Sequence, residues 1–336
     1  MKNLFIGIDF SKLKVDVSFF ERENLEVFKH AQFVNEQQGF KEMIAWLKKE
    51  SLIAPSEWLF CGEYTGLYSV NLSEFLSSKG FSVWIDSPLQ IKLSMGIQRG
   101  KSDKADSGQL ALYAYRFEDK AKAYAPLSKQ CKSLQMLYAH RERLVKVKVS
   151  LSQAATELRM VIKRDPTVRY IYDKELLQVN RLKKDIKDVE KKMLECIEQD
   201  PQLYKNYTLL VSIKGIALIN AVSMIIHTGN FTRFVNARQY ACYVGVAPFG
   251  KTSGTSKKNK PRISKIANKE CKALLTQAAK CSCKHNPELR EYYNRKIAEG
   301  KPLWLVTNNI RNKLIARCFS VIARQEPYQE SFRAAS

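Results

Sequence analysis

The order of short apolar runs in the first 117 residues is what most constrains the fold of this chain. Apolar or alternating runs of the length typical of β-strands occupy residues 4–9, 14–20, 25–34, 58–61 and 81–85. Helical spacing of apolar residues occurs in 35–50, 67–78 and 104–117. Three consecutive strands and then alternating helices and strands predict a mixed five-stranded sheet with helices on its faces.

A different pattern follows from about residue 126. Charged helical patterns with almost no glycine cover residues 131–163 and 173–197, and Pro166 separates them because proline breaks a helix. In the second stretch, apolar residues recur at intervals of three and four residues, with lysines and acids between them. This predicts an antiparallel helical hairpin or coiled-coil arm, whose default role is self-association.

The third segment has no Asp or Glu between Asp200 and Glu270 but many basic residues. Within it, residues 210–225 predict two helices joined by a turn at Lys214-Gly215-Ile216. That turn fits either a helix–hairpin–helix, whose backbone N–H groups bind a phosphate, or a plain helical hairpin. Residues 250–262 (GKTSGTSKKNKPR) predict a polar loop, and helices at 268–283 and 304–325 complete a mainly helical segment. The expected domains are 1–125, 126–203 and 204–330.

The net charge of +23 points to a polyanionic partner. Nucleic acid is favoured over a membrane surface because no apolar span is uninterrupted and neither terminus predicts a cationic amphipathic helix. The amino terminus does not resemble a signal peptide, and the eight cysteines are scattered, so a cytoplasmic protein with reduced thiols is expected. Cys281, Cys283 and His285 lack a second ligand pair for zinc, which favours structural or incidental cysteines.

Four acids have placements that suit a metal site. Asp9 ends the first strand and Glu63 follows the fourth, while Asp103 and Asp106 lie three residues apart on one face of a helix start. Each acid alone also fits a turn or a helix cap. Together they could bind two Mg²⁺ ions, which assist phosphodiester chemistry. Nearby cations able to contact phosphate are Arg99, Lys101 and Lys104.

The order of four motifs resembles a known family. GIDFSK, GEYTG, KSDKAD, a helical stretch and QYACYVGVAPFGKTSGTSKKNKPRISK together are similar to the Piv-type DEDD transposases of the IS110 insertion-sequence family, over essentially the whole chain. The resemblance implies an RNase H-like (RuvC-like) amino-terminal domain, in which Asp9, Glu63, Asp103 and Asp106 bind Mg²⁺. It also implies a carboxy-terminal transposase domain in which Ser253 attacks DNA, and a structured guide RNA that pairs with donor and target DNA.

Two positions depart from the pattern of that family. The last two acids usually stand in an Asp-Ala-x-x-Asp-Ala pattern, and here the residues read Asp-Lys-Ala-Asp-Ser. Ala267 stands where a glycine commonly follows the ISK segment. Neither change removes a predicted catalytic side chain.

Ser253 has no distinguishing signal apart from the resemblance, because Thr252, Thr255 and Ser256 are equivalent hydroxyls and no histidine lies nearby in sequence. As a nucleophile it would conserve the energy of the DNA ester for rejoining. The sequence does not identify its base, for which a metal-bound hydroxide or one of the acids is conceivable.

The predicted function is therefore a bacterial, nucleoid-associated DNA recombinase that is guided by RNA and assembles as a dimer or tetramer. The alternatives are a metal-dependent nuclease that uses water and a non-catalytic RNA- or DNA-binding protein. The predicted nucleic-acid contacts outside the first domain are Lys214, Lys251, Lys257, Lys258, Lys260, Arg262 and Lys265.

Overall fold

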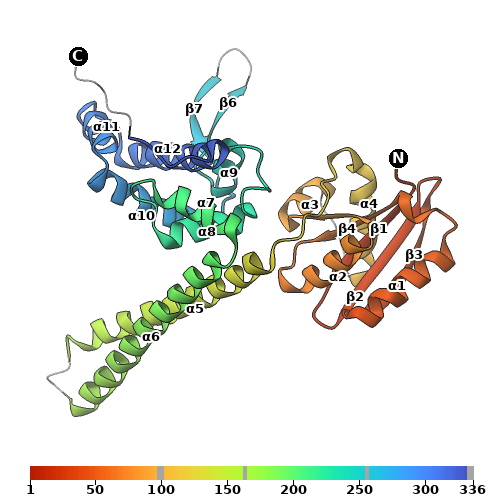
Figure 1. Cartoon of the computed structure of the whole chain (residues 1–336), viewed down its shortest axis with the longest axis horizontal. Coiled ribbons are helices and arrows are strands. Elements are labelled where there is room, and N and C mark those ends of the chain that lie inside the picture. The colour runs from red at the N-terminus through yellow and green to blue at the C-terminus, as the bar shows by residue number, and fades with distance from the viewer. Residues whose placement is uncertain (97–101, 162–164, 254–256, 331–336) are drawn as a thin grey trace. The chain divides into compact units, whose positions relative to one another are not determined.

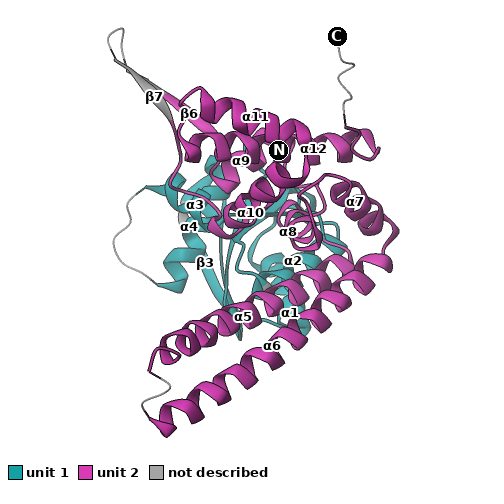
Figure 2. Cartoon of the chain, turned by 90° about the vertical axis from the view of Figure 1, so that its left-hand side faces the viewer, with its two compact units in different colours: residues 1–126 teal, residues 127–336 magenta. Residues whose placement is uncertain are grey.

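The computed structural model describes residues 1–96, 102–161, 165–253 and 257–330, and side chains within these ranges except at 26–27, 67 and 251–261. The chain divides into two compact units, Met1–Pro126 and Leu127–Ser336 (Figure 2). Each unit is described by itself.

Unit 1 is built on a five-stranded sheet with the strand order β3-β2-β1-β4-β5. β1 pairs antiparallel with β2, and β2 with β3, whereas β4 runs parallel to both β1 and β5. The predicted mixed sheet is confirmed. The strands are β1 (Leu4–Phe10), β2 (Lys14–Glu21), β3 (Asn24–Val34), β4 (Trp58–Glu63) and β5 (Ser82–Asp86).

Alternation along the strands divides the core of unit 1 between the two faces of the sheet. Residues at even positions of β1, such as Ile6 and Ile8, pack with α1 (Gln37–Glu50) and α2 (Leu67–Ser78). Phe5 of the same strand packs instead with α3 (Pro88–Met95) and α4 (Asp103–Arg116). The helices therefore cover both faces, as the period of two in a strand requires.

Gly7 allows α4 to lie directly on β1. A Cβ atom at this position would lie 2.0 Å from the carbonyl oxygen of Ser107 and 2.3 Å from the amide nitrogen of Ala111. Both contacts are with backbone atoms, which cannot rotate away. Ser107 is fully buried, and its hydroxyl lies 2.7 Å from that of Ser18 on β2.

One helix of unit 1 is absent from the sequence-based prediction. α3 spans eight residues and buries only Ile91, so its sequence has no helical stripe of apolar residues. Two single turns, Pro55–Glu57 and Glu118–Lys120, complete the unit.

Unit 2 begins with two long antiparallel helices that lie side by side, α5 (Lys129–Leu158) and α6 (Pro166–Glu198) (Figure 1). Val179, Ile186 and Met193 form the buried stripe of α6, and Arg141 of α5 donates a hydrogen bond of 2.7 Å to Glu190. α6 begins seven residues earlier than the spacing predicts. Its first residue is Pro166, which is tolerated at the first position of a helix, and the Asp165 side chain caps it.

Six shorter helices form the rest of the described core of unit 2. α8 is the most buried of them, with seven of its eleven residues buried. The sequence pattern does not predict α9 or α11, because the first spans eight residues and the second buries only Leu289. The helices are α7 (Pro201–Val211), α8 (Leu218–Thr228), α9 (Ala237–Val244), α10 (Lys269–His285), α11 (Pro287–Ala298) and α12 (Leu303–Arg324).

The segment predicted to be a polar loop is instead an antiparallel hairpin, formed by β6 (Pro248–Ser253) and β7 (Lys257–Ile263). Its strands carry few apolar residues, so alternation gives no signal, and backbone pairing alone defines them. No described helix of either unit has both the length and the apolar composition needed to cross a bilayer.

Candidate active site

Strand register places Asp9 and Glu63 at the same end and on the same face of the sheet. Ile8 pairs with Gly62 in parallel register, and each acid is the next residue along its strand. Asp9 lies two residues after Gly7, and Glu63 lies two residues after Cys61, so both are on the face that α4 covers. Both side chains are partly buried.

The first turn of α4 carries Asp103 and Asp106 to that same end. Tyr115, near the end of α4, contacts Phe5 of β1 with a ring separation of 5.2 Å. Ser107 lies over Gly7, so the helix runs opposite to β1 and its first turn lies toward Asp9. The side chain of Ser102 caps this turn by accepting a hydrogen bond from Ala105.

Lys14 and Asp16 are part of this site although the sequence analysis did not single them out. The Lys14 ammonium donates to Asp103 at 2.8 Å and lies 3.3 Å from Asp16, which is directly opposite Asp9 in the β1–β2 pairing. Asp16 is only 2% exposed and also lies within hydrogen-bonding distance of His30 and Gln32. The sequence signal that could have identified Asp16 is its place among apolar residues in the middle of a predicted strand, where an acid is costly to bury unless it has partners.

Asp86 is a further carboxylate at this end, at the last position of β5 and paired with Glu63. Tyr113 of α4 donates a hydrogen bond of 2.9 Å to its Oδ2 atom. Burial raises the pKa of the Cys61 thiol, and the charges of Asp86 and Glu63 raise it further. This end of the sheet is therefore an environment that opposes additional negative charge and favours a cation.

The donor set fits a divalent cation in its chemistry, and its residues lie at one end of the sheet. Carboxylate oxygens are the ligands that Mg²⁺ prefers, and adjacent strand ends with a helix start can direct several of them to one volume. The described side chains are not gathered into a metal cage, since no three His, Cys, Asp or Glu residues among them lie close enough to hold one ion. In this arrangement the Lys14 ammonium donates a hydrogen bond to one carboxylate oxygen of Asp103.

The predicted nucleic-acid contacts are unevenly placed. Arg99 and Lys101 lie outside the described residues, while Lys104 is exposed in the first turn of α4. Lys214 forms an ion pair of 2.9 Å with Glu330. Its turn packs against α10, where the Ser282 hydroxyl donates to the Lys214 carbonyl at 2.8 Å.

The predicted nucleophile and the other predicted nucleic-acid contacts lie in the β6–β7 hairpin or just after it. Ser253 is the last residue of β6, and its backbone pairs with Lys257. Arg262 and Lys265 are exposed. The strands also contain the other predicted lysines, whose side chains are not described: Lys251, Lys258 and Lys260.

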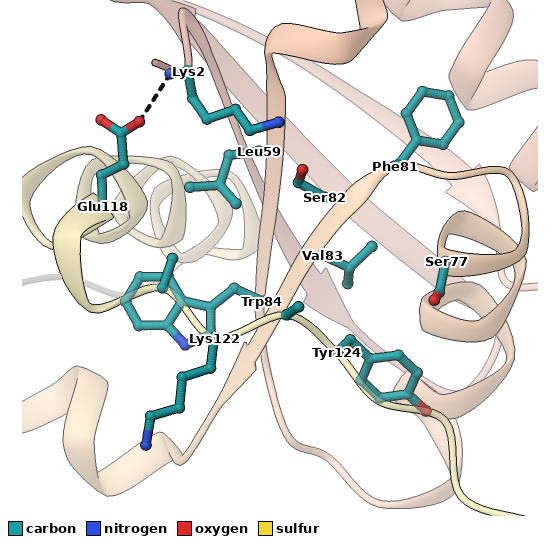
Figure 3. Close-up of a pocket in the computed structure, with 12 residues that line it drawn as sticks. Lys2, Leu59, Ser77, Phe81, Ser82, Val83, Trp84, Glu118, Lys122 and Tyr124 are labelled. Carbon is teal, nitrogen blue, oxygen red and sulfur yellow. Dashed lines mark hydrogen bonds between the residues drawn. The ribbon is translucent and has the colours of Figure 1, made fainter.

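A pocket in unit 1 lies away from the acids. Lys2, Leu59 and Val83 line it at the starting ends of the strands, together with Glu118 and Tyr124 from the segment after α4 (Figure 3). Glu118 accepts a hydrogen bond of 2.8 Å from the backbone amide of Lys2. The acids lie at the opposite strand ends, so this pocket is separate from the candidate site.

Comparison with known proteins identifies the family. A model of the IS110-type DEDD transposase domain, described as "Transposase", matches residues 6–161, and the model "Transposase IS116/IS110/IS902 family" matches 207–294. The two matches are to parts of one family and together span well over half of the chain. This chain belongs to the IS110 family of DEDD transposases. It is therefore an enzyme that acts on DNA, and its membership indicates the use of a divalent metal.

Individual relatives extend the similarity to nearly the whole chain. The pilin gene-inverting proteins of Moraxella bovis and Moraxella lacunata are each 26% identical over 98% of this transposase and 99% of their own length. An uncharacterized 43.6 kDa protein of insertion element IS110 from Streptomyces coelicolor is 31% identical over 28% of the chain and 23% of its own length. The predicted family and the prediction of a DNA-acting enzyme are confirmed. The mixed α/β domain also agrees with an RNase H-like DEDD transposase.

Proposed function

We propose that this transposase cuts and rejoins DNA through an ester between Ser253 and a DNA phosphate. Unit 1 would act as a RuvC-like domain and hold Mg²⁺ through Asp9, Glu63, Asp103 and Asp106. The observation that carries the proposal is the placement of these four acids at one end and on one face of a single sheet. Mg²⁺ bound there would stabilise negative charge on the reacting phosphate.

The proposed exchange balances in bonds and protons. Ser253 Oγ gives up its proton as it forms a bond to phosphorus, the bond from phosphorus to one sugar oxygen breaks, and that oxygen takes up a proton and leaves as a hydroxyl. In the second step a hydroxyl of another DNA end attacks the same phosphorus. The attacking hydroxyl gives up its proton, the bond from phosphorus to Ser253 Oγ breaks, and Ser253 takes up a proton. One ester replaces another in each step, so no external energy source is needed.

The basic residues of unit 2 would bind donor and target DNA and a structured guide RNA through phosphate contacts. The two relatives that span the whole chain are named for gene inversion, which favours an enzyme that exchanges strands between two DNA sites. Helices α5 and α6 would mediate self-association as a coiled-coil arm, because they expose apolar side chains such as Val147, Val149 and Leu177.

Trapping of the protein–DNA ester tests the proposal. A DNA substrate with a nick beside the cleavage site should form an adduct with the wild-type protein and none with Ser253→Ala, which should still bind DNA. Thr252→Val and Ser256→Ala remove neighbouring hydroxyls and should leave the adduct intact. Normal cleavage by Ser253→Ala without any adduct would instead show a metal-dependent nuclease that uses water. Failure of both the wild-type and variant proteins to cut would favour a non-catalytic binding protein.

A further inference from the structure

Three side chains hold two consecutive backbone carbonyls just before the β6–β7 hairpin. Lys272 of α10 donates a hydrogen bond of 2.9 Å to the carbonyl of Gly245. Asn308 and Asn312 of α12 donate to the carbonyl of Val246 at 2.8 Å and 2.9 Å. Only Ala247 separates this anchored segment from Pro248, the first residue of β6.

Arg311 lies on α12 between these two asparagines in sequence and lacks a strong partner. Its Nε atom is buried and makes no hydrogen bond within the described structure, and its Nη1 atom has only a long contact of 3.4 Å with Asn308. A guanidinium has five N–H donors in a fixed plane. Leaving buried donors unsatisfied costs free energy, which a bound acceptor would recover.

Lys272 and Arg311 are close enough for their charges to interact. Burial lowers the pKa of the Lys272 ammonium, and the charge of Arg311 lowers it further. Burial also lowers the pKa of Arg311. Two like charges that are partly removed from water repel one another unless an anion lies between them.

No described carboxylate neutralises this pair. Neither Lys272 nor Arg311 forms an ion pair with any described Asp or Glu, whereas Arg317 on the same helix is paired with Glu288 at 2.7 Å. The undescribed residues of unit 2 contain no Asp or Glu either, as the sequence shows. The charge of this pair is therefore uncompensated by acidic side chains of unit 2.

We infer that Lys272 and Arg311 form a binding site for a phosphodiester group of a nucleic-acid backbone at the base of the β6–β7 hairpin. A phosphate oxygen is the acceptor that a planar guanidinium and an adjacent ammonium recognise together. The site lies at the start of the segment that carries Ser253, so a phosphate bound here would fix the path of the strand relative to that hairpin. The inference rests on the action of the family on DNA and does not require Ser253 to be the nucleophile.

The first test measures affinity at several salt concentrations. The full chain would be titrated into labelled duplex DNA of about three helical turns, and separately into an RNA stem-loop. Arg311→Gln and Lys272→Gln should each weaken binding about tenfold, and each lost phosphate contact should reduce the log–log salt slope by about 0.9 for the duplex. An effect on DNA alone or on RNA alone identifies the source of the phosphate.

Matched controls remove the same charge from exposed positions of the same helices. Arg324→Gln on α12 and Lys280→Gln on α10 should each change affinity by less than about threefold, because exposed charges contribute mainly to a diffuse field. Equal losses for the two pairs of variants would overturn the inference, as would unchanged affinity for both nucleic acids.

A stability measurement separates binding from a purely structural role. Arg311→Met removes a half-buried charge whose buried Nε donor has no partner, and it should raise the melting temperature of the free protein while weakening nucleic-acid binding. Arg311→Lys keeps the charge and should recover part of the lost affinity. A lower melting temperature for Arg311→Met together with wild-type affinity would show that Arg311 only supports packing.

Discussion

Lys14 Nζ lies 2.8 Å from Asp103 Oδ2, so a lysine of β2 holds one of the four acids proposed to bind metal. The same ammonium lies 3.3 Å from the buried Asp16. The hydrogen bond to Asp103 is the main cause that raises the pKa of Lys14. A cation of this chain thus occupies a position where a metal ion would compete for the same oxygen.

Removal of this ammonium should strengthen divalent metal binding. Lys14→Gln deletes a positive charge that repels an incoming cation and removes its hydrogen bond to Asp103, so the dissociation constant for Mn²⁺ or Mg²⁺ should fall by roughly threefold to tenfold. Isothermal titration calorimetry on the full chain measures this. Lys12→Gln, at an exposed position two residues away, is the control and should bind metal as the wild type does. Weaker binding by Lys14→Gln would show that the lysine positions Asp103 for the metal.

A methyl group at position 7 should destabilise unit 1. Gly7→Ala would force a Cβ atom to within 2.0 Å of the Ser107 carbonyl oxygen, so α4 must move away from β1 at a cost of about 3 kcal/mol in unfolding free energy. Chemical denaturation measures the loss. Gly108→Ala on the same helix is the control, because its Cβ would meet only Phe28 at 3.6 Å. That variant should gain about 0.5–1 kcal/mol.

Basic residues of the β6–β7 hairpin should account for much of the salt dependence of DNA binding. Replacing Lys257, Lys258, Lys260 and Arg262 by glutamine should lower the log–log salt slope by about 0.9 for each phosphate contact that is lost. The same four-charge change on the exposed surface of α6, at Lys183, Lys184, Lys187 and Lys191, should leave the slope nearly unchanged. Equal slopes for the two quadruple variants would show that the hairpin does not contact phosphates.

Protomers with complementary defects should restore activity to one another. The acids lie in unit 1 and Ser253 in unit 2, and we expect each working site to take its carboxylates from one protomer and its serine from another. Asp9→Asn and Ser253→Ala should each be inactive alone, and their mixture should recover a fraction of recombination. No recovery, despite mixed oligomers detected by mass spectrometry, would mean that each site is built within one chain.

Stability should fall below about pH 6.5 because of His227. Burial lowers its pKa from the ordinary 6.5, the charge of Glu270 opposes this, and the charge of Arg233 lowers the pKa further. The unfolded chain then binds the proton more tightly, so the stability contribution is present above pH 6.5 and is lost as the pH drops toward the folded pKa. Each unit of pKa difference is worth about 1.4 kcal/mol. His227→Gln should flatten this acid limb in denaturation curves, whereas His140→Gln, on the exposed surface of α5, should not.

Elements with a strong apolar period were predictable from the sequence. All five strands of unit 1 and the helix α2 are found within a few residues of the predicted positions, because their sequences have the spacing of apolar residues typical of these elements. Such a period is absent from α3 and from the β6–β7 hairpin, and α9 spans only eight residues, too few for its period to stand out. Their conformations depend on tertiary packing and on backbone pairing, which leave no repeating pattern.

The candidate site was predictable only in part for a related reason. Strand ends indicated Asp9 and Glu63, but Asp16 and Asp86 join the site through strand register, which depends on which strands become neighbours. The contact between Lys14 and Asp103 joins residues 89 positions apart, and only the fold brings them together. Ser253 has no chemical signal in the sequence, so its role rests on the family.

Hydrogen bonds to the carbonyls of Gly245 and Val246 fix the backbone just before β6, so the orientation of the whole hairpin depends on this segment. Ser253 lies five residues beyond Pro248, which at the rise of a strand is about 17 Å of reach. A tilt of about 10° at the base would displace the serine by about 3 Å over that length, and reactions of this kind tolerate misplacement of only about 1 Å. The accuracy with which Ser253 meets a phosphate would then depend on two asparagine amides and a lysine far from the bond that breaks.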